Sequence, residues 1–351
     1  MKTKIVKVDK EKPEEELMKE AGEILKSGGL VAFPTETVYG LGGNALDPKA
    51  SEKIYAAKGR PSDNPLIVHI AQWEALPAIV SELPEKAVKL GKACWPGPLT
   101  MIFRKSELVP LETTGGLETV AVRFPVHPVA KALILAGGGY IAAPSANLSG
   151  RPSPTKAQHV IDDLSGRIDM IVDGGEADIG LESTIVDFTG EEPVILRPGF
   201  LNQERMKEII GSVEIDAGII SSDSKVKPKA PGMKYRHYAP KGDLTLVEGS
   251  PEAVAEKINE LAEEKIRQGK KTAILCASEH KEKYKNGEVL PLGRLSQEEE
   301  IAQHLFDALR KMDDDGIEYI YSETFDTKRI GAAIMNRLLK AAGHKIIEVN
   351  K

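Results

Sequence analysis

The stretch from residue 58 to residue 69 constrains the fold more than any other part of the chain. The residues before it predict a helix, because Asp47 can cap its start, Pro48 fits its first turn and Gly59 is typical of a residue that ends a helix. Two prolines then lead into a short apolar run that is typical of a buried strand. Basic and amide side chains are therefore held on a rigid turn between a helix and a strand. Functional sites are often built on such turns, although a solvated polar turn is the alternative.

Length and charge limit the class of protein. The chain has 351 residues, which favours two domains over one. Its composition, 41% hydrophobic and 28% charged, is that of an ordinary globular protein. The formal net charge is -6, so a site for anions must be a local cluster of basic residues and not the field of the whole chain.

The two cysteines, Cys94 and Cys276, have no neighbouring Cys or His at metal-ligand spacing. This argues against a disulfide scaffold and a structural zinc, and it favours a reducing cytoplasm. The first residues are rich in Lys and Glu, so we expect no signal peptide. The longest apolar run, 132–144, is too short and too glycine-rich to span a bilayer. The sequence predicts a soluble cytoplasmic protein without membrane contact.

The first 211 residues alternate between helix and strand patterns, which predicts an α/β fold. Predicted helices cover 14–27, 47–57, 85–93 and 127–136. Predicted strands cover 30–33, 66–70, 99–103, 119–123, 140–143, 170–172, 184–186 and 194–197. Between the first two strands, residues 35–42 are dense in hydroxyls and glycines and are interpreted as a loop. We expect a many-stranded sheet with several helices.

Residues 212–241 are polar without periodicity, which is typical of a linker. The linker ends in a block of aromatic and basic residues, 231–240, that could fold back as a lid or be a plain surface loop. From residue 242 onward we expect strands at 244–247, 272–277, 317–321 and 346–349, alternating with helices at 252–268, 297–311 and 330–342. Ser296 and Glu299 suggest a capping box for the second of these helices. The alternation predicts a small parallel α/β domain over 242–351.

Two glycine patterns imitate a dinucleotide-binding fingerprint. Gly40–Ala45 has Asp63 at a suitable distance, but it does not directly follow a strand and no helix begins at once. Gly137–Ala142 leads into a strand. We interpret both as turns, so an NAD-linked enzyme is a weak alternative. The sequence contains no P-loop motif, no credible nucleophile–base pair and no paired histidine spacing for a metal.

What remains is positive charge combined with hydroxyl and amide groups in segments fixed by Gly and Pro. The cations are Lys58, Arg60, Arg123, Arg151, Arg197, Lys234 and Arg236, and the polar groups include Ser145, Asn147, Ser149, Ser153, Ser183 and Thr184. Such groups suit catalysis by positioning and charge stabilisation at a nucleotide phosphate. They also suit passive contact with a nucleic-acid backbone. We expect Arg60, Arg123, Ser145 and Arg197 to converge on one cavity.

These motifs resemble the YrdC-like family, and the whole chain resembles its long form, the threonylcarbamoyl-AMP synthases with a C-terminal Rossmann-like domain. The resemblance is dense from about residue 15 to residue 240, and its motif positions show no obvious departure. The matching segments are 34–41, 58–69, 95–100, 119–123, 144–147, 153–155, 182–184, 197–199, 231–240 and 333–337.

The resemblance implies three parts: a YrdC-like catalytic domain at 1–211, a linker or lid at 212–241, and a smaller Rossmann-like α/β domain at 242–351. The first domain is expected to be an open twisted mixed sheet with helices and a concave basic face. The implied activity is that of a nucleotidyltransferase, which condenses L-threonine, bicarbonate and ATP to threonylcarbamoyl-AMP and pyrophosphate. The product would supply the downstream tRNA threonylcarbamoyl-transfer machinery, with possible direct contact to tRNA or other RNA. An RNA-binding module without catalysis is the alternative.

The resemblance also assigns residues. L-Threonine would be held by Thr37, His69, Arg123 and Ser183, with Arg123 on the carboxylate and His69 or Thr37 on the hydroxyl. ATP would be surrounded by Lys58, Arg60, Asn64, Thr119, Ser145, Ser153, Arg197 and Tyr238, the last reaching back from the linker as a lid. The catalytic set would be Lys58, Arg60, Ser145 and Arg197. Mg²⁺ would travel on the ATP phosphates, and we expect no metal site formed by the protein.

Overall fold

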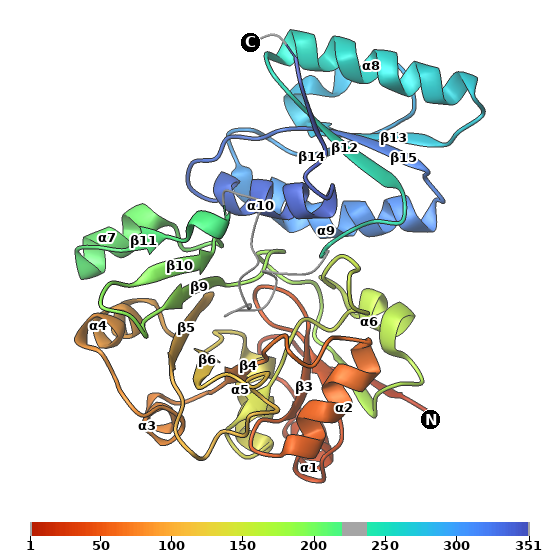
Figure 1. The fold of residues 1–351 in the computed structure, drawn as a ribbon. Coiled ribbons are helices and arrows are strands. Elements are labelled where there is room, and N and C mark those ends of the chain that lie inside the picture. Colours follow the sequence, from red (N-terminus) through yellow and green to blue (C-terminus); the bar gives the residue numbers. More distant parts are fainter. Residues whose placement is uncertain (1, 220–236, 350–351) are drawn as a thin grey trace. The chain divides into compact units, whose positions relative to one another are not determined.

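The computed structural model describes residues 2–219 and 237–349 (Figure 1). The chain divides into two compact units. The second unit contains the chain from residue 237 onward together with two short segments from the first half, Gly150–Pro152 and Ile179–Leu181. The first unit contains the rest. Most of the predicted lid block, including Lys234 and Arg236, lies outside the described residues.

The first unit is built on a mixed sheet whose described part has 11 strands. The strand order is β1-β8-β2-β3-β7-β4-β6-β5-β9-β10-β11. The strands are β1 Lys4–Lys7, β2 Val31–Phe33, β3 Gly40–Asn44, β4 Ile67–His69, β5 Leu99–Arg104, β6 Thr119–Arg123, β7 Ile141–Ala142, β8 Met170–Asp173, β9 Thr184–Asp187, β10 Val194–Arg197 and β11 Glu214–Ile215. The helices are α1 Glu15–Lys26, α2 Pro48–Lys58, α3 Leu76–Ile79, α4 Glu85–Cys94, α5 Pro128–Ala136, α6 Ala157–Leu164 and α7 Gln203–Ile210, with short 3₁₀ turns at Trp73–Ala75 and Ala217–Ile219.

The predicted helices and strands of this unit are confirmed to within a few residues at their ends. Helix α2 begins as predicted, because Asp47 Oδ1 accepts a hydrogen bond from the Lys49 amide at 3.0 Å. It ends at Gly59, whose φ of 62° is left-handed. Strands β1 and β11 and helices α3, α6 and α7 were not predicted, and β11 lies in the segment predicted as a linker. In β1 three of four residues are exposed, so the sequence carries no apolar run there.

The interpretation of Gly40–Ala45 as a turn is wrong, because most of this segment is strand β3, antiparallel to β2 and β7. Glycine is required by packing in this strand. A Cβ atom on Gly42 would lie 2.9 Å from the Cγ2 of Ile141 and 3.0 Å from the Cε1 of Phe33. The segment therefore has neither the turn nor the strand–helix junction of a dinucleotide-binding fingerprint.

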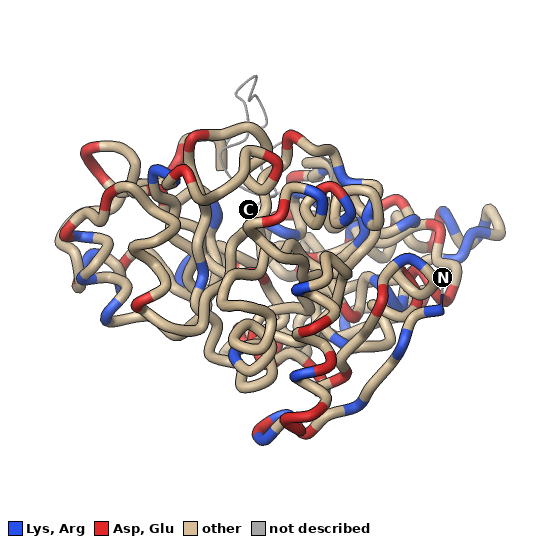
Figure 2. The backbone as a smooth tube through the Cα atoms, turned by 90° about the horizontal axis from the view of Figure 1, so that it is seen from below, with Lys and Arg blue, Asp and Glu red and all other residues tan. Residues whose placement is uncertain are grey.

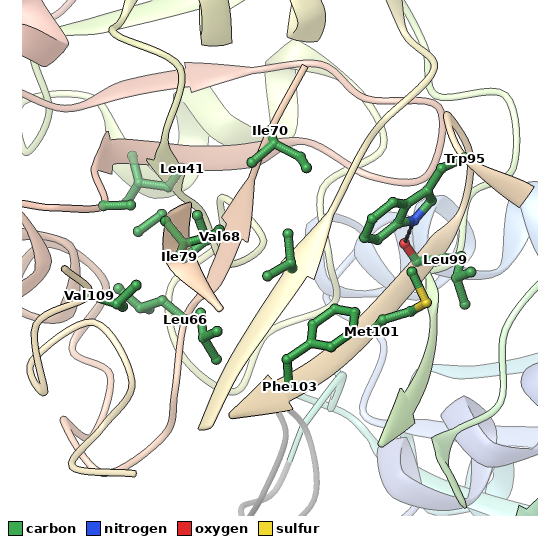
Figure 3. Close-up of a cluster of buried hydrophobic side chains, with 14 of the residues drawn as sticks. Leu41, Leu66, Val68, Ile70, Ile79, Trp95, Leu99, Met101, Phe103 and Val109 are labelled. Carbon is green, nitrogen blue, oxygen red and sulfur yellow. Dashed lines mark hydrogen bonds between the residues drawn. The ribbon is translucent and has the colours of Figure 1, made fainter. Parts of the chain in front are cut away.

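Two apolar clusters lie on opposite faces of the sheet. Val68 belongs to the large cluster shown in Figure 3, where Trp95 donates a hydrogen bond from Nε1 to the Leu99 carbonyl at 2.7 Å. Ile67, its neighbour in β4, belongs to a smaller cluster with Ile102, Ala121, Ile185 and Leu196. Because side chains alternate along a strand, the residues two positions from the smaller cluster project from the same face. The predicted threonine site begins there.

The second unit is a five-stranded parallel sheet of order β14-β13-β15-β12-β16. Its strands are β12 Asp243–Glu248, β13 Thr272–Ala277, β14 Glu288–Gly293, β15 Tyr319–Glu323 and β16 Ile346–Glu348. Its helices are α8 Pro251–Arg267, α9 Glu298–Asp314 and α10 Gly331–Ala341, with a 3₁₀ segment at Ser278–Lys283. The predicted small parallel α/β domain is confirmed, with β14 as a strand that was not predicted.

The capping box predicted from Ser296 and Glu299 is wrong. The N-cap of α9 is Gln297, and no side chain caps it. The loop before the helix is held instead by Glu300, whose Oε2 accepts from the amide of Arg294 at 3.2 Å. A carboxylate in the first turn therefore reaches back beyond the cap position.

The two borrowed segments are tightly bound within the second unit. Arg310 donates to the Pro152 carbonyl from Nη2 at 2.6 Å and from Nε at 3.1 Å. The amide of Ala239 donates to the Gly150 carbonyl at 2.9 Å. A Cβ atom on Gly180 would lie 2.5 Å from the Cα of Gln303, so this segment packs directly against α9.

Candidate active site

The strand register places three polar side chains in one row. His69 in β4 is paired with Arg123 in β6, and Arg123 is paired with Thr100 in β5. Each stands two residues from a member of the small apolar cluster, so all three project from the same face of the sheet. All three are buried. The sheet therefore brings the predicted His69 and Arg123 together.

The row continues through hydroxyl and guanidinium contacts to the next strands. Thr100 Oγ1 lies 2.8 Å from Ser183 Oγ. Arg197, only 4% exposed, donates from Nη2 to Ser183 Oγ at 3.2 Å and from Nε to the Ser183 carbonyl at 3.0 Å. A Cβ atom on Gly199 would lie 2.4 Å from the Thr184 amide nitrogen, which explains the glycine after Arg197. Ser183 and Arg197 thus belong to the same polar row.

Arg123 forms a buried ion pair with Glu36, a residue absent from the predicted set. Its Nη2 lies 2.8 Å from Glu36 Oε1, and the two side chains are 6% and 5% exposed. Within the described chain, neither carboxylate oxygen of Glu36 and neither the Nε nor the Nη2 of Arg123 has a hydrogen-bond partner. Buried charges with unmade hydrogen bonds need a physical explanation, and a missing ligand provides one. The only signal for Glu36 in the sequence is its place between the two motif threonines.

His69 is held in its neutral form. Burial, and secondly the charge of Arg123, lowers its pKa to about 3. Its Nδ1 lies 3.0 Å from the Ile67 carbonyl, so this nitrogen carries the ring proton and Nε2 is left as an acceptor. His127, also near Glu36 and Arg123, has a pKa lowered to about 4, mainly by burial. In the described part of the chain neither of its ring nitrogens has a partner.

The loop between β2 and β3 places Thr37 next to this row. Thr35 Oγ1 donates to the Val38 carbonyl at 2.6 Å and lies 2.9 Å from Thr37 Oγ1. The Tyr39 amide donates to the Pro154 carbonyl, and the Ala146 amide donates to the Tyr39 carbonyl, both at 2.8 Å. These backbone contacts join the threonine loop to the two serine-containing loops predicted for ATP.

Lys58 links the end of α2 to one of those loops. Its Nζ donates to the carbonyls of Ser145, at 2.5 Å, and of Asn147, and the side chain is only 2% exposed. Ser145 Oγ donates to Asn147 Oδ1 at 2.6 Å. Ser145 also forms a β-bridge with Gly40. Lys58, at the end of α2, and Ser145, in the loop after β7, are therefore brought together.

Arg60 and Asn64 lie on the same turn after α2. Two guanidinium nitrogens of the half-buried Arg60 donate to that turn, Nε to the Asn64 carbonyl at 3.2 Å and Nη2 to the Pro65 carbonyl at 3.1 Å. Asn64 is buried, and its Oδ1 has no hydrogen-bond partner among the described residues. These two hydrogen bonds fix the Arg60 guanidinium on the turn that follows α2.

The remaining predicted residues are placed separately. Ser153 is buried and donates to Glu182 Oε1 at 2.5 Å, and Thr119 lies half-buried at the start of β6. Tyr238 belongs to the second unit, where its ring stacks on Phe306 at 5.1 Å between centroids. Its backbone is left-handed, with φ of 64°. The lid function of Tyr238 stays a prediction.

Figure 2 shows Lys and Arg interspersed with Asp and Glu along the chain. Among residues 2–219 and 237–349, no group of three or more His, Cys, Asp or Glu is arranged to hold a metal ion. None of the helices in these ranges is both long and apolar enough to cross a membrane.

Two family models match the chain. Residues 23–199 match Sua5_yciO_yrdC, described as "Telomere recombination", and residues 201–343 match "Threonylcarbamoyl-AMP synthase, C-terminal domain". The threonylcarbamoyl-AMP synthase of Pyrococcus abyssi is 49% identical over 340 residues, covering 97% of this chain and 98% of that protein. The Bacillus subtilis synthase is 49% identical over 329 residues and covers 93% of each.

Solved structures give the same result. The crystal structure of P. abyssi Sua5 complexed with L-threonine has a TM-score of 0.94 and 49% sequence identity, covering 99% of this chain and 100% of that one. Escherichia coli YciO has a TM-score of 0.53 and 25% identity, covering 58% of this chain and 99% of its own. The likeness to Sua5 therefore extends over both units.

Proposed function

The chain belongs to the Sua5–YciO–YrdC family, and we propose that it is a threonylcarbamoyl-AMP synthase that condenses L-threonine, bicarbonate and ATP to threonylcarbamoyl-AMP and pyrophosphate. The reaction is that of a nucleotidyltransferase. One observation carries the proposal to the site: the buried pair of Arg123 and Glu36, with hydrogen-bonding capacity unused on both sides among the described residues. A guanidinium beside a carboxylate is the complement of a zwitterion, and free threonine is one.

In the threonine site we assign the substrate carboxylate to Arg123 and the substrate ammonium to Glu36. The threonine hydroxyl donates to the Nε2 of His69 or contacts Thr37, and Ser183 completes the row. The neutral state of His69 supports this, because an imidazolium would have no acceptor nitrogen. The Arg123–Glu36 ion pair has no directed hydrogen bond between the two side chains. In the proposed complex, Arg123 donates directed hydrogen bonds to the threonine carboxylate.

The ammonium must lose a proton before its nitrogen can attack the bicarbonate carbon. We assign Glu36 as the general base that accepts this proton, because its carboxylate oxygens are buried beside the site. The amine and bicarbonate then form a carbamate and release water. A carbamate oxygen attacks the α-phosphorus of ATP, and the bond from that phosphorus to the bridging oxygen breaks as pyrophosphate leaves. No side chain of the protein needs to act as a nucleophile.

We assign the ATP site to Lys58, Arg60, Asn64, Thr119, Ser145, Ser153 and Arg197, with Tyr238 as the lid. Within this set Lys58, Arg60, Ser145 and Arg197 act on the reacting phosphates, by holding the α-phosphorus near the carbamate and neutralising charge on pyrophosphate. The buried Lys58 already uses two donors on the loop of Ser145, so it shapes the site as well as adding charge. Mg²⁺ enters as part of the substrate, on the ATP phosphates.

The product is a reactive mixed anhydride, so a later enzyme must transfer its threonylcarbamoyl group to an acceptor. We propose that this is the threonylcarbamoyl-transfer machinery acting on tRNA in the cytoplasm. Direct RNA contact is the alternative use of the basic residues. Burial argues against it, because Lys58, Arg123 and Arg197 are all at most 5% exposed and a duplex or strand could not reach them.

The test is release of pyrophosphate by the full-length protein. ATP alone should give little release, and L-threonine with bicarbonate should raise it strongly. Glycine in place of threonine is the matched control, because it lacks the hydroxyl that His69 or Thr37 would contact. Release that ignores threonine would contradict the proposal, and salt-sensitive RNA binding without release would favour the RNA-binding alternative.

A further inference from the structure

The second unit contains a cavity that the proposed reaction does not use. It has a volume of about 440 Å³, within the range of roughly 300–1,000 Å³ that is typical of small-molecule sites. All the residues that line it belong to the second unit. None of them is among the residues assigned to threonine or ATP.

The cavity lies at the carboxyl edge of the parallel sheet. Its lining includes Gly249, which follows β12, and Glu323, Thr324 and Phe325 at the end of β15. Strands β12 and β15 are neighbours, but the chain leaves them to opposite faces: Figure 1 shows α8 on one side of the sheet and α10 on the other. In open α/β sheets such a divergence of loops forms the crevice in which ligands bind.

Apolar side chains form two walls of the cavity. Pro251 and Val254 come from α8, and Ile301 and Ile334 come from α9 and α10. Leu295, 43% exposed, stands in the loop before α9. Walls contributed by helices from both faces suit a flat apolar group between them, such as a nucleobase.

A fixed polar network stands between these walls. Glu323 is 5% exposed and accepts from the Ala277 amide at 2.9 Å and from the Tyr284 hydroxyl at 2.5 Å. His280 Nδ1 lies 2.9 Å from Glu323 Oε1. A carboxylate oxygen can only accept, so Nδ1 of His280 carries a hydrogen and holds the ring against Glu323.

The charged groups of the lining select the class of ligand. Glu298, Glu323 and Asp326 bring three carboxylates against one guanidinium, that of Arg329. Glu298 keeps most of its accepting capacity, because its contacts are long: 3.3 Å from the Gly331 amide and 3.7 Å from Arg329. Such a lining repels phosphate and accepts hydrogen bonds from hydroxyl or amino groups.

From these observations we propose that the cavity binds an uncharged nucleoside, with the base between the apolar walls and the sugar hydroxyls donating to Glu298. The second unit then recognises a ligand of its own, separate from the ATP used in the reaction.

The test measures adenosine binding to the full-length protein by isothermal titration calorimetry, with the first site filled by L-threonine and a non-hydrolysable ATP analogue. One adenosine per chain should still bind. Glu298→Gln and Leu295→Trp should each weaken it by about tenfold or more, the first by removing a charged acceptor and the second by filling the cavity. AMP should bind at least about tenfold more weakly than adenosine, because of the carboxylates.

Ile266→Trp is the matched control, because Ile266 is also in this unit and is 40% exposed but does not line the cavity. It should leave adenosine affinity unchanged. Melting temperatures establish that each variant is folded. If Leu295→Trp does not fold, the test depends on Glu298→Gln alone. No binding at millimolar adenosine, equal binding of AMP, or binding that Glu298→Gln leaves intact would each overturn the proposal.

Discussion

His69 and Arg123 are register partners on the adjacent parallel strands β4 and β6, and burial, aided by the guanidinium charge, lowers the pKa of the imidazole to about 3. A basic side chain beside a histidine thus keeps that histidine neutral. The same arginine is left with unused donors among the described residues. One pair of strand neighbours therefore provides both an acceptor for a hydroxyl and donors for a carboxylate.

This pair predicts how stability depends on pH. The unfolded imidazole takes up a proton as the pH falls below about 6.5, whereas the folded one, with a pKa of about 3, does not. The free energy of unfolding should therefore fall with decreasing pH in this window, by up to about 1.4 kcal/mol per pH unit from His69. Urea denaturation of the protein and of His69→Gln between about pH 4 and about pH 7 measures it. Equal slopes for the two proteins would contradict the prediction.

Glu36→Gln should lower threonine-dependent pyrophosphate release by about 100-fold, because the amide cannot take the ammonium proton. The loss should shrink as the pH rises, since more threonine then carries a free amine. Glu118→Gln, whose side chain is 84% exposed, is the control and should behave as the unaltered protein. A loss for Glu36→Gln that is the same at every pH would show that Glu36 only positions Arg123.

Lys58→Ala and Arg60→Ala should differ in stability although both lose turnover. Removing Lys58 leaves the buried carbonyls of Ser145 and Asn147 without its ammonium, which should lower the free energy of unfolding by roughly 1–3 kcal/mol. Arg60 is half-buried, so water can replace its hydrogen bonds to the Asn64 and Pro65 carbonyls, and its removal should change stability by less than about 1 kcal/mol. Urea denaturation beside pyrophosphate release separates the two effects, and equal stability of the two variants would be the contrary result.

Gly42→Ala should destabilise the protein by about 1–3 kcal/mol, because the new methyl group would press on Ile141 and Phe33. Gly190→Ala is the matched control, since its nearest contact would be 3.7 Å away, to the Glu192 carbonyl oxygen. Thermal or urea unfolding measures both. A stable Gly42→Ala variant would mean that β3 can move away from its neighbours.

Tyr238→Phe tests the proposed lid without removing its ring. The stacking on Phe306 should be kept, so the variant should stay folded, which its melting temperature checks. If the hydroxyl contacts ATP, nucleotide affinity should fall about five- to tenfold, as expected for one lost hydrogen bond. Tyr238→Ala should lose both stability and affinity. Unaltered ATP affinity in Tyr238→Phe would remove Tyr238 from the ATP site.

Much of the fold could be predicted from local signals. Asp47, Pro48 and Gly59 determine the ends of α2 through capping and backbone geometry that need no distant partner. Strand β3 could not be predicted in this way. Its glycines carry no strand preference, and packing against side chains of other segments, such as Phe33 and Ile141 around Gly42, explains them. Strand β14 was missed because it contains Pro291 and is mostly half-buried.

The site shows the same division. His69 and Arg123 could be selected from motifs, and the register of β4 and β6 then brings them together. Glu36 lies in a quoted motif, but its partnership with Arg123 depends on two segments 87 positions apart in the sequence and has no local pattern. Arg60 shows the opposite case. The motif predicted that its guanidinium binds ATP, but in the structure Nε and Nη2 donate to carbonyls of its own turn.

The segments Gly150–Pro152 and Ile179–Leu181 belong to the second unit although they lie within the sequence of the first. The two units therefore cannot be separated by cutting the chain at one position. A protein truncated before residue 237 would keep these segments but lose Arg310, the donor to the Pro152 carbonyl, and the surface of α9 on which Gly180 packs.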